Sequence, residues 1–265
     1  MATPSPTQPG PPSAAELQKG YDLTRFRRTR GQPAKYVELL HGQIAGAGMN
    51  AAVYFRFAGP LNPASLPASA ADTLREGATA YVVDVTPGSP TFGQRSPMLV
   101  KFHAEGNRFI DDNWLSLQPV PGLPLRQKTT YAAILTTGLK ALTGGGLAQD
   151  PDLARLLASE SPTAEPYKTA WLRYAPLRSY LMQHREDVGA ATVFTTQDAT
   201  SIMTRLREAT YQQPQPTPQN LTYLRSHDGL TDVYTGTFAA PNFQQGDPPY
   251  WSEGGALSLD AGGRP

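Results

Sequence analysis

The chain has 265 residues, of which 23 are Lys or Arg and 22 are Asp or Glu, so its formal net charge at pH 7 is +1. This balance argues against a broad electrostatic footprint for nucleic acid or an anionic membrane, which depends on clustered basic charge. The sequence contains no cysteine, which excludes disulfides, thiolate metal sites and a cysteine nucleophile. No apolar run reaches the roughly 18 residues of a membrane-spanning helix, so we expect no transmembrane segment.

The first segment, residues 1–18, is rich in Pro, Ser and Gly and shows no apolar periodicity. This composition predicts a disordered leader. It lacks the charged start and apolar stretch of a signal peptide. Arg25, Arg27, Arg28 and Arg30 follow closely, and two interpretations stay open for them: a solvated loop, or a small basic patch.

Residues 19–149 have the pattern of an all-β domain. In the first apolar run, Val53, Phe55 and Phe57 alternate with polar positions, as in a half-buried strand. Between the first two runs, residues 63–76 have room for a helical turn. Short strands with Pro and Gly turns between them are typical of a β-sandwich. The predicted strands are 51–59, 78–85, 96–105, 108–120 and 129–138.

Residues 150–212 predict a mainly helical segment with one strand. We expect helices at 150–159 and 198–212, with Asp150 and Asp198 as N-caps, and a strand at 189–197. Residues 165–186 also have helical character. Pro176 predicts a break within them because its ring clashes with the preceding turn.

Residues 213–265 begin with a proline-rich connector at 213–219 and resume strand character at 232–243. Near the end, Ala261-Gly262-Gly263 suits a turn into a following strand. We therefore expect this part to lead into a downstream domain.

No motif for catalysis, cofactor binding or metal binding occurs in the sequence. Gly-x-Ser-x-Gly and His-Glu-x-x-His are absent, and the glycines at 144–146 lack the Lys-Ser/Thr of a phosphate loop and predict a turn. The histidines, His41, His103, His184 and His227, are scattered. We therefore expect no catalytic residue, no cofactor and no metal site in this chain.

Four polar groupings resemble sites but favour ordinary structure. Ser226-His227-Asp228 precedes Gly229 and predicts a turn, because a catalytic triad needs side chains that converge from separate segments. Asp111-Asp112-Asn113 lacks the acidic alternation of a calcium loop and also predicts a turn. The pairs Glu160 with Glu165 and Asp247 with Glu253 are interpreted as solvated acids.

The large aromatic residues divide into two groups. Trp114 and Trp171 are expected in the core. Tyr250 and Trp251 follow Asp247-Pro248-Pro249 in a predicted loop, and with Phe243 they form the candidate interface for another domain or chain.

Three stretches resemble the bacterial immunoglobulin-like (Ig-like) domain that precedes larger catalytic domains. They are AAVYFRFAGPLNPASLP (51–67), AYVVDVTPGSP (80–90) and LPLRQKTTYAAILTTGLKALTGGGL (123–147). Leu125, Thr130, Tyr131 and Gly138 match that pattern, whereas Gln127 stands where proline is common. ATVFTTQDAT (191–200) and YTGTFAAPNFQQGDPPYW (234–251) resemble the connecting region of large secreted α/β-hydrolase proteins of the lipase or esterase class.

The resemblance implies an α+β chain: an Ig-like β-sandwich, a mainly helical segment and terminal strands. It implies an extracellular or bacterial outer-surface location, and a non-catalytic region that positions a downstream α/β-hydrolase domain. The alternative is a stand-alone structural or adhesive surface protein that binds another chain or assembles. In either case nucleic acid is not expected as a partner.

Overall fold

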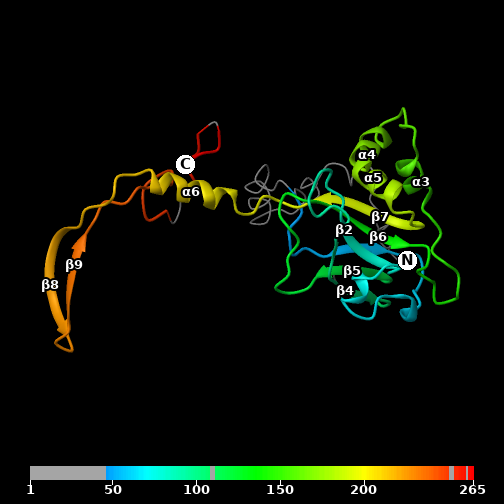
Figure 1. The fold of residues 1–265 in the computed structure, drawn as a ribbon, viewed down its shortest axis with the longest axis horizontal. Helices are drawn as coiled ribbons and strands as arrows, with labels where there is room; N and C mark the ends of the chain where they lie inside the picture. The colour runs from blue at the N-terminus through cyan, green and yellow to red at the C-terminus, as the bar shows by residue number, and fades with distance from the viewer. Residues whose placement is uncertain (1–45, 108–110, 251–253, 261) are drawn as a thin grey trace, which may run out of the picture. The chain divides into compact units, whose positions relative to one another are not determined.

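A computed structural model describes residues 46–107, 111–250, 254–260 and 262–265 (Figure 1). The chain divides into two compact units, Met1–Asp198 (unit 1) and Ala199–Pro265 (unit 2). The expected leader, the arginines at 25–30 and His41 lie outside the described residues. The fold is mixed, with helices and several antiparallel sheets.

Unit 1 contains two antiparallel sheets (Figure 1). The strand order of the first sheet is β1-β5-β4 and that of the second is β3-β2-β6-β7. The five strands expected between 51 and 138 are all present, and β7 is the strand expected at 189–197. Their bounds are β1 Val53–Arg56, β2 Ala80–Asp84, β3 Arg95–Ser96, β4 Met98–His103, β5 Trp114–Pro119, β6 Thr130–Thr136 and β7 Val188–Thr195.

The two sheets pack face to face around the first core. Val82 of β2, Leu117 of β5 and Leu135 of β6 are fully buried in it, and Phe55 of β1 packs against it. The alternation expected in β1 is confirmed, because Tyr54 and Arg56 are exposed on the opposite face. Two short 3-10 helices, η2 (Pro63–Ser65) and η3 (Asp72–Leu74), form the helical turns expected between β1 and β2.

A layer of helices covers the other face of the second sheet (Figure 1). These are α3 (Pro151–Leu157), α4 (Tyr167–Arg173) and α5 (Ala175–Gln183). Leu153 of α3 and Leu177 of α5 bury their side chains against Tyr81 and Ile134 of the sheet, which makes a second core. The sequence predicted a two-layer β core, whereas the central strands β2 and β6 are buried on both faces.

The predicted starts and breaks of the unit 1 helices are confirmed. The Asp150 carboxylate accepts the backbone N–H of Asp152 at 2.8 Å and that of Leu153 at 3.3 Å, as an N-cap does. The break expected near Pro176 lies at Tyr174. Pro176 is placed in the first turn of α5, where a missing N–H costs nothing.

Unit 2 contains helix α6 (Ser201–Tyr211) and a hairpin of β8 (Gln219–His227) and β9 (Thr231–Thr237). The chain reverses over three residues, Asp228 to Leu230, between the paired residues His227 and Thr231. Asp228 and Gly229 have φ angles of 52° and 65°, in the left-handed region that Gly adopts freely and Asp more readily than most residues. The sequence predicted Asp198 as the N-cap of α6, and this prediction is wrong. The cap position is Thr200, and the Asp198 carboxylate lies 2.5 Å from Lys128 Nζ.

Candidate functional site

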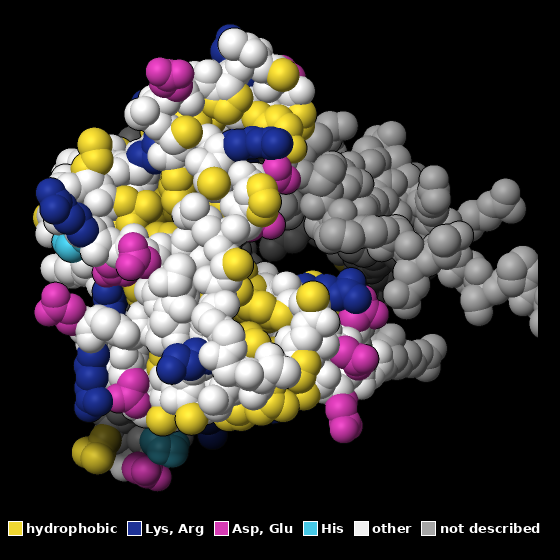
Figure 2. Space-filling model, turned by 90° about the vertical axis from the view of Figure 1, so that its right-hand side faces the viewer, with side chains coloured by type: hydrophobic (Ala, Val, Ile, Leu, Met, Phe, Trp, Pro, Cys, Tyr) yellow, Lys and Arg dark blue, Asp and Glu magenta, His cyan; other side chains and the backbone are white. Residues whose placement is uncertain are grey.

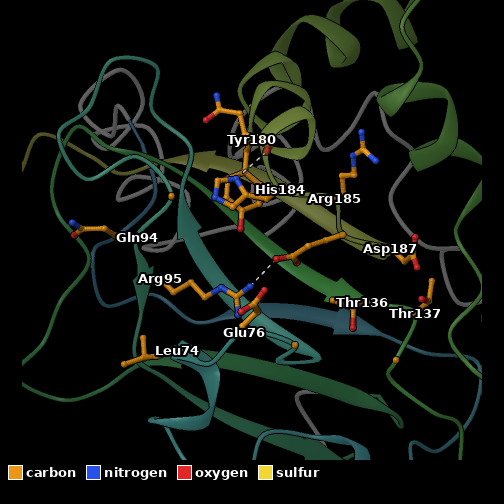
Figure 3. A pocket seen from close by; sticks show the side chains of 15 residues that line it. Leu74, Glu76, Gln94, Arg95, Thr136, Thr137, Tyr180, His184, Arg185 and Asp187 are labelled. Atoms are coloured by element: carbon orange, nitrogen blue, oxygen red, sulfur yellow. Dashed lines mark hydrogen bonds and ion pairs between the residues drawn. The ribbon is translucent and has the colours of Figure 1, made fainter.

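Unit 1 carries a polar hollow of about 990 Å³ at the end of helix α5 (Figure 3). Its lining comes from the loop after η3, from β3, from the end of β6 and from the turn between α5 and β7. Arg95, Tyr180 and His184 line it, with Glu76 beside Arg95 (Figure 3), and Glu186 belongs to the same lining. No sequence signal predicts this cluster, because its members lie in separate segments with no motif spacing.

Two charged groups of the hollow, Arg95 and Glu186, form an ion pair. Arg95 Nη2 lies 2.7 Å from Glu186 Oε1, and the Tyr81 hydroxyl donates to Glu186 Oε2. The Arg95 guanidinium also lies 3.7 Å from the centre of the Tyr81 ring, a cation–π contact. These contacts tie β2 and β3 to the turn that enters β7.

Burial, and secondly repulsion from the Glu76 carboxylate, raise the pKa of Glu186 above its ordinary value. The ion pair with Arg95 acts in the opposite direction, because it favours the ionised carboxylate. The carboxylate is thus held by its partners in a partly desolvated position. Such an environment occurs both in structural ion pairs and at catalytic carboxylates with a shifted pKa.

His184 has the arrangement of a packed side chain and not of a general base. Its ring stacks on Tyr180 with 4.2 Å between centroids and 13° between planes, and its Nδ1 lies 3.2 Å from the Tyr180 carbonyl oxygen. No serine is among the described residues that line the hollow, so His184 faces no serine nucleophile there. Both contacts are with Tyr180 of the same helix, so the geometry favours a role in packing the end of α5.

The Ser226-His227-Asp228 sequence lies at the tip of the hairpin, as predicted. His227 Nε2 is 3.3 Å from Asp228 Oδ2, and both side chains are largely exposed to solvent. Ser226 pairs across the hairpin with Asp232 and not with a base. The three side chains do not form the convergent set that acyl transfer needs.

Several side chains of the other acidic groupings make an ion pair or a hydrogen bond within unit 1. Arg56 Nη1 lies 3.1 Å from Asp111 Oδ2, and Asp112 Oδ1 accepts the backbone N–H of Gly106 at 2.5 Å. Glu165 Oε2 accepts the backbone N–H of Thr169 at 3.2 Å. Glu253 lies outside the described residues. Within the described part of the chain, no group of three His, Asp or Glu side chains is placed to hold a metal ion.

Two of the candidate interface residues, Phe243 and Tyr250, lie in the segment that follows β9. Phe243 is half-buried, and its carbonyl oxygen accepts the backbone N–H of Ser258 at 2.8 Å. The Tyr250 hydroxyl accepts a hydrogen bond from Asn242 Nδ2 at 2.7 Å, so this hydroxyl has a partner within the loop. Trp251 lies outside the described residues.

The sequence predicted Trp114 and Trp171 in the core. This prediction is wrong, because neither residue belongs to a core cluster. Trp114 lies on the outer face of the first sheet and packs edge-on against Tyr54, with ring centroids 6.0 Å apart. The Trp171 indole N–H donates to the Ala158 carbonyl at 2.8 Å, and the Arg178 guanidinium lies 3.7 Å from the ring centre. The Trp171 N–H thus has a backbone partner, whereas the Trp114 Nε1 is buried with no hydrogen-bond partner among the described residues.

The largest exposed apolar feature among the described residues of unit 2 is the β8–β9 hairpin. Leu221, Tyr223 and Tyr234 share one of its faces and are exposed by 63%, 53% and 56%. Leu224 and Leu230 add further exposed apolar surface. Such a concentration of apolar side chains is typical of an interaction element. The sequence prediction placed only β9 and missed β8.

Comparison with protein-family models and with curated proteins finds no match to this chain. The function therefore has to be argued from its own geometry. Figure 2 shows one face on which Lys and Arg side chains are interspersed with Asp and Glu, without a large area of one sign. Within the described residues, no helix is both long and apolar enough to cross a bilayer.

Proposed function

We propose that this chain is a non-catalytic accessory region of a secreted or surface-attached bacterial hydrolase. In this proposal unit 1 is an Ig-like β-sandwich that serves as a rigid scaffold, and unit 2 makes contact with a further domain. The single observation that carries the scaffold role is the corner built by Tyr131.

Tyr131 stands at the start of β6, where the chain crosses from one sheet to the other. Its hydroxyl accepts the backbone N–H of Arg126, five residues upstream, at 3.0 Å. A tyrosine that bonds back to the backbone at this corner is a hallmark of Ig-like sandwiches. Tyr131 is also one of the residues that carry the resemblance to the bacterial Ig-like domain.

The strand order supports the same assignment. When β1 to β7 are taken as strands B, C, C′, D, E, F and G, the sheets become B-E-D and C′-C-F-G. This grouping agrees with the two sheets of Ig-like domains. The covering helices α3, α4 and α5 are then an insertion between strands F and G.

The hydrolase context rests on the resemblance of residues 191–200 and 234–251 to connecting regions of secreted hydrolases. The exposed hairpin supports the contact role of unit 2, since apolar side chains at that density favour a binding surface. The same observation favours the alternative, a stand-alone surface protein that acts by binding or assembling.

Two measurements test this proposal. The purified chain is expected to release no p-nitrophenol from p-nitrophenyl butyrate above the buffer rate. Turnover that disappears in His227→Ala would contradict the non-catalytic assignment.

The second measurement tests the partner. A photo-crosslinking amino acid in place of Phe238, which is 64% exposed, is introduced into the protein in its native host. The proposal expects crosslinked peptides from a domain that carries Gly-x-Ser-x-Gly. Crosslinks exclusively between copies of this chain would favour the alternative and overturn the hydrolase context.

A further inference from the structure

Strand β9 has an open edge without the usual protection against pairing. Among the described residues, the hairpin is a sheet of two strands only, so one side of β9 has no strand beside it. The seven residues of β9, TDVYTGT, include three threonines, a valine and a tyrosine, which favour strands. Of the charged residues and prolines that commonly block an edge, they include only Asp232.

The opposite edge, β8, is irregular. The ladder register shifts between Gln219 and Thr222 and again between Tyr223 and Arg225, and in both places β8 carries the extra residue. Asn220 within it has a φ of 53°. Bulges of this kind twist a strand and oppose further pairing, so β9 is the edge open to another strand.

Among the described residues of unit 2, no layer covers the apolar face of the hairpin. An isolated two-stranded hairpin is marginally stable in water, and three or more strands with an apolar face are needed for independent stability. Tyr223 and Tyr234 already pack edge to face across the ladder, with ring centroids 5.6 Å apart. Leu221 lies over Gly236, where no side chain competes for the space.

We propose that β9 pairs in antiparallel orientation with β9 of a second copy of this chain, about a two-fold axis at Tyr234. The two hairpins then form one sheet of four strands, β8-β9-β9-β8. This association does not depend on the proposed function, because it uses only the hairpin.

The residues of β9 are self-complementary in this register. Tyr234 faces Tyr234 of the second copy, which extends the Tyr223–Tyr234 pair into a row of four rings on one face. Asp232, the only charged residue of β9, faces Gly236, so the two like charges are not opposite each other. Val233 faces Thr235 on the other side of the sheet.

Sedimentation velocity across a range of concentrations tests the association. The chain is expected to shift from monomer to dimer as its concentration rises. Thr235→Lys is expected to raise the dimer dissociation constant by about tenfold or more, since a lysine on the edge opposes pairing. Thr222→Lys is the matched control, because Thr222 is the direct ladder partner of Thr235 but lies on β8. A monomer at every concentration would overturn the proposal, as would equal effects of the two variants.

Disulfide trapping tests the register, and the absence of native cysteines makes each introduced thiol unique. Directly opposed residues of antiparallel strands have Cα atoms about 4.5–5.5 Å apart, within the span of a disulfide. Tyr234→Cys alone, and an equimolar mixture of Val233→Cys with Thr235→Cys, are expected to crosslink readily under mild oxidation. Thr222→Cys is expected to stay largely monomeric. Crosslinking of Thr222→Cys as fast as that of Tyr234→Cys would refute β9 pairing, and a weak mixed disulfide between positions 233 and 235 would refute the register.

Discussion

Single hydrogen bonds at the ends of strands hold the loops of unit 1 in place. Tyr131 fixes the corner before β6 through the N–H of Arg126, and burial raises the pKa of its phenol. Asp84 fixes the loop after β2 in a similar way. Its Oδ1 accepts the N–H of Thr86 at 2.8 Å, and its Oδ2 accepts the hydroxyls of Ser89 and Thr91 at 2.9 and 2.7 Å.

Tyr131→Phe is expected to destabilise unit 1 by about 1–3 kcal/mol, because it removes the acceptor of the Arg126 N–H. Chemical denaturation followed by circular dichroism measures the change. Tyr54→Phe is the control, since its half-exposed side chain lies on the outer face of the first sheet. Equal stability of Tyr131→Phe and the wild type would argue against a structural corner.

Burial alone would raise the pKa of Asp84, but its hydrogen bonds outweigh burial and lower the pKa below its ordinary value. The stability that the ionised carboxylate contributes is therefore present above about pH 4 and is lost as the pH falls through the lowered pKa. Denaturation of the wild type at a series of pH values is expected to show this loss. Asp84→Asn is expected to be less stable at neutral pH and to lose less stability on acidification. Parallel pH profiles for the two proteins would contradict this role of Asp84.

At the scale of elements, the second sheet differs from a half-exposed antiparallel sheet because helices cover its outer face. Ile134 and Leu135 are neighbours on β6, yet both are fully buried, one under the helices and the other between the sheets. The sequence of β2, AYVVD, lacks the polar and apolar alternation of a half-exposed strand. That continuity was compatible with burial on both faces, but a short apolar run does not identify what covers it.

Ile134→Ala and Leu135→Ala are both expected to lower the free energy of unfolding by about 2–5 kcal/mol, because each leaves a cavity in a packed layer. Thermal or urea denaturation measures the two values. Leu99→Ala on the exposed face of β4 is expected to cost much less. A small effect of Ile134→Ala, comparable with that of Leu99→Ala, would contradict the helical layer.

Across the whole molecule, the two units differ in how much of their secondary structure is buried. Every residue of β2 is buried, whereas every residue of β8 is exposed. Local opening is easiest where few apolar contacts have to be broken. The structure therefore combines a well-packed unit 1 with an exposed hairpin in unit 2.

Hydrogen exchange measured by mass spectrometry is expected to be slowest in β2 and β6 and fastest in β8. Protection of β9 is expected to rise with protein concentration, because pairing with a second copy covers its edge. Protection of β2 serves as the internal control and is expected to be independent of concentration. Protection of β9 that does not change over a concentration range in which dimers form would place the contact elsewhere.

The sequence by itself determined the elements whose signals are local. The strands of unit 1, the Asp150 cap, the break before Pro176 and the turn at Asp228-Gly229 all follow from dihedral preferences and near-neighbour hydrogen bonds. It did not reveal β8, because a strand exposed along its whole length has no buried face to impose alternation.

Only the tertiary structure decided what depends on residues far apart in the chain. The ion pair of Arg95 with Glu186 joins positions 91 residues apart, and the placement of α3 and α5 on the second sheet sets the second core. The positions of Trp114 and Trp171 outside the two core clusters belong to the same class. A composition or a spacing contains no information on such contacts, because they are selected by how whole layers pack and not by the preference of any single segment.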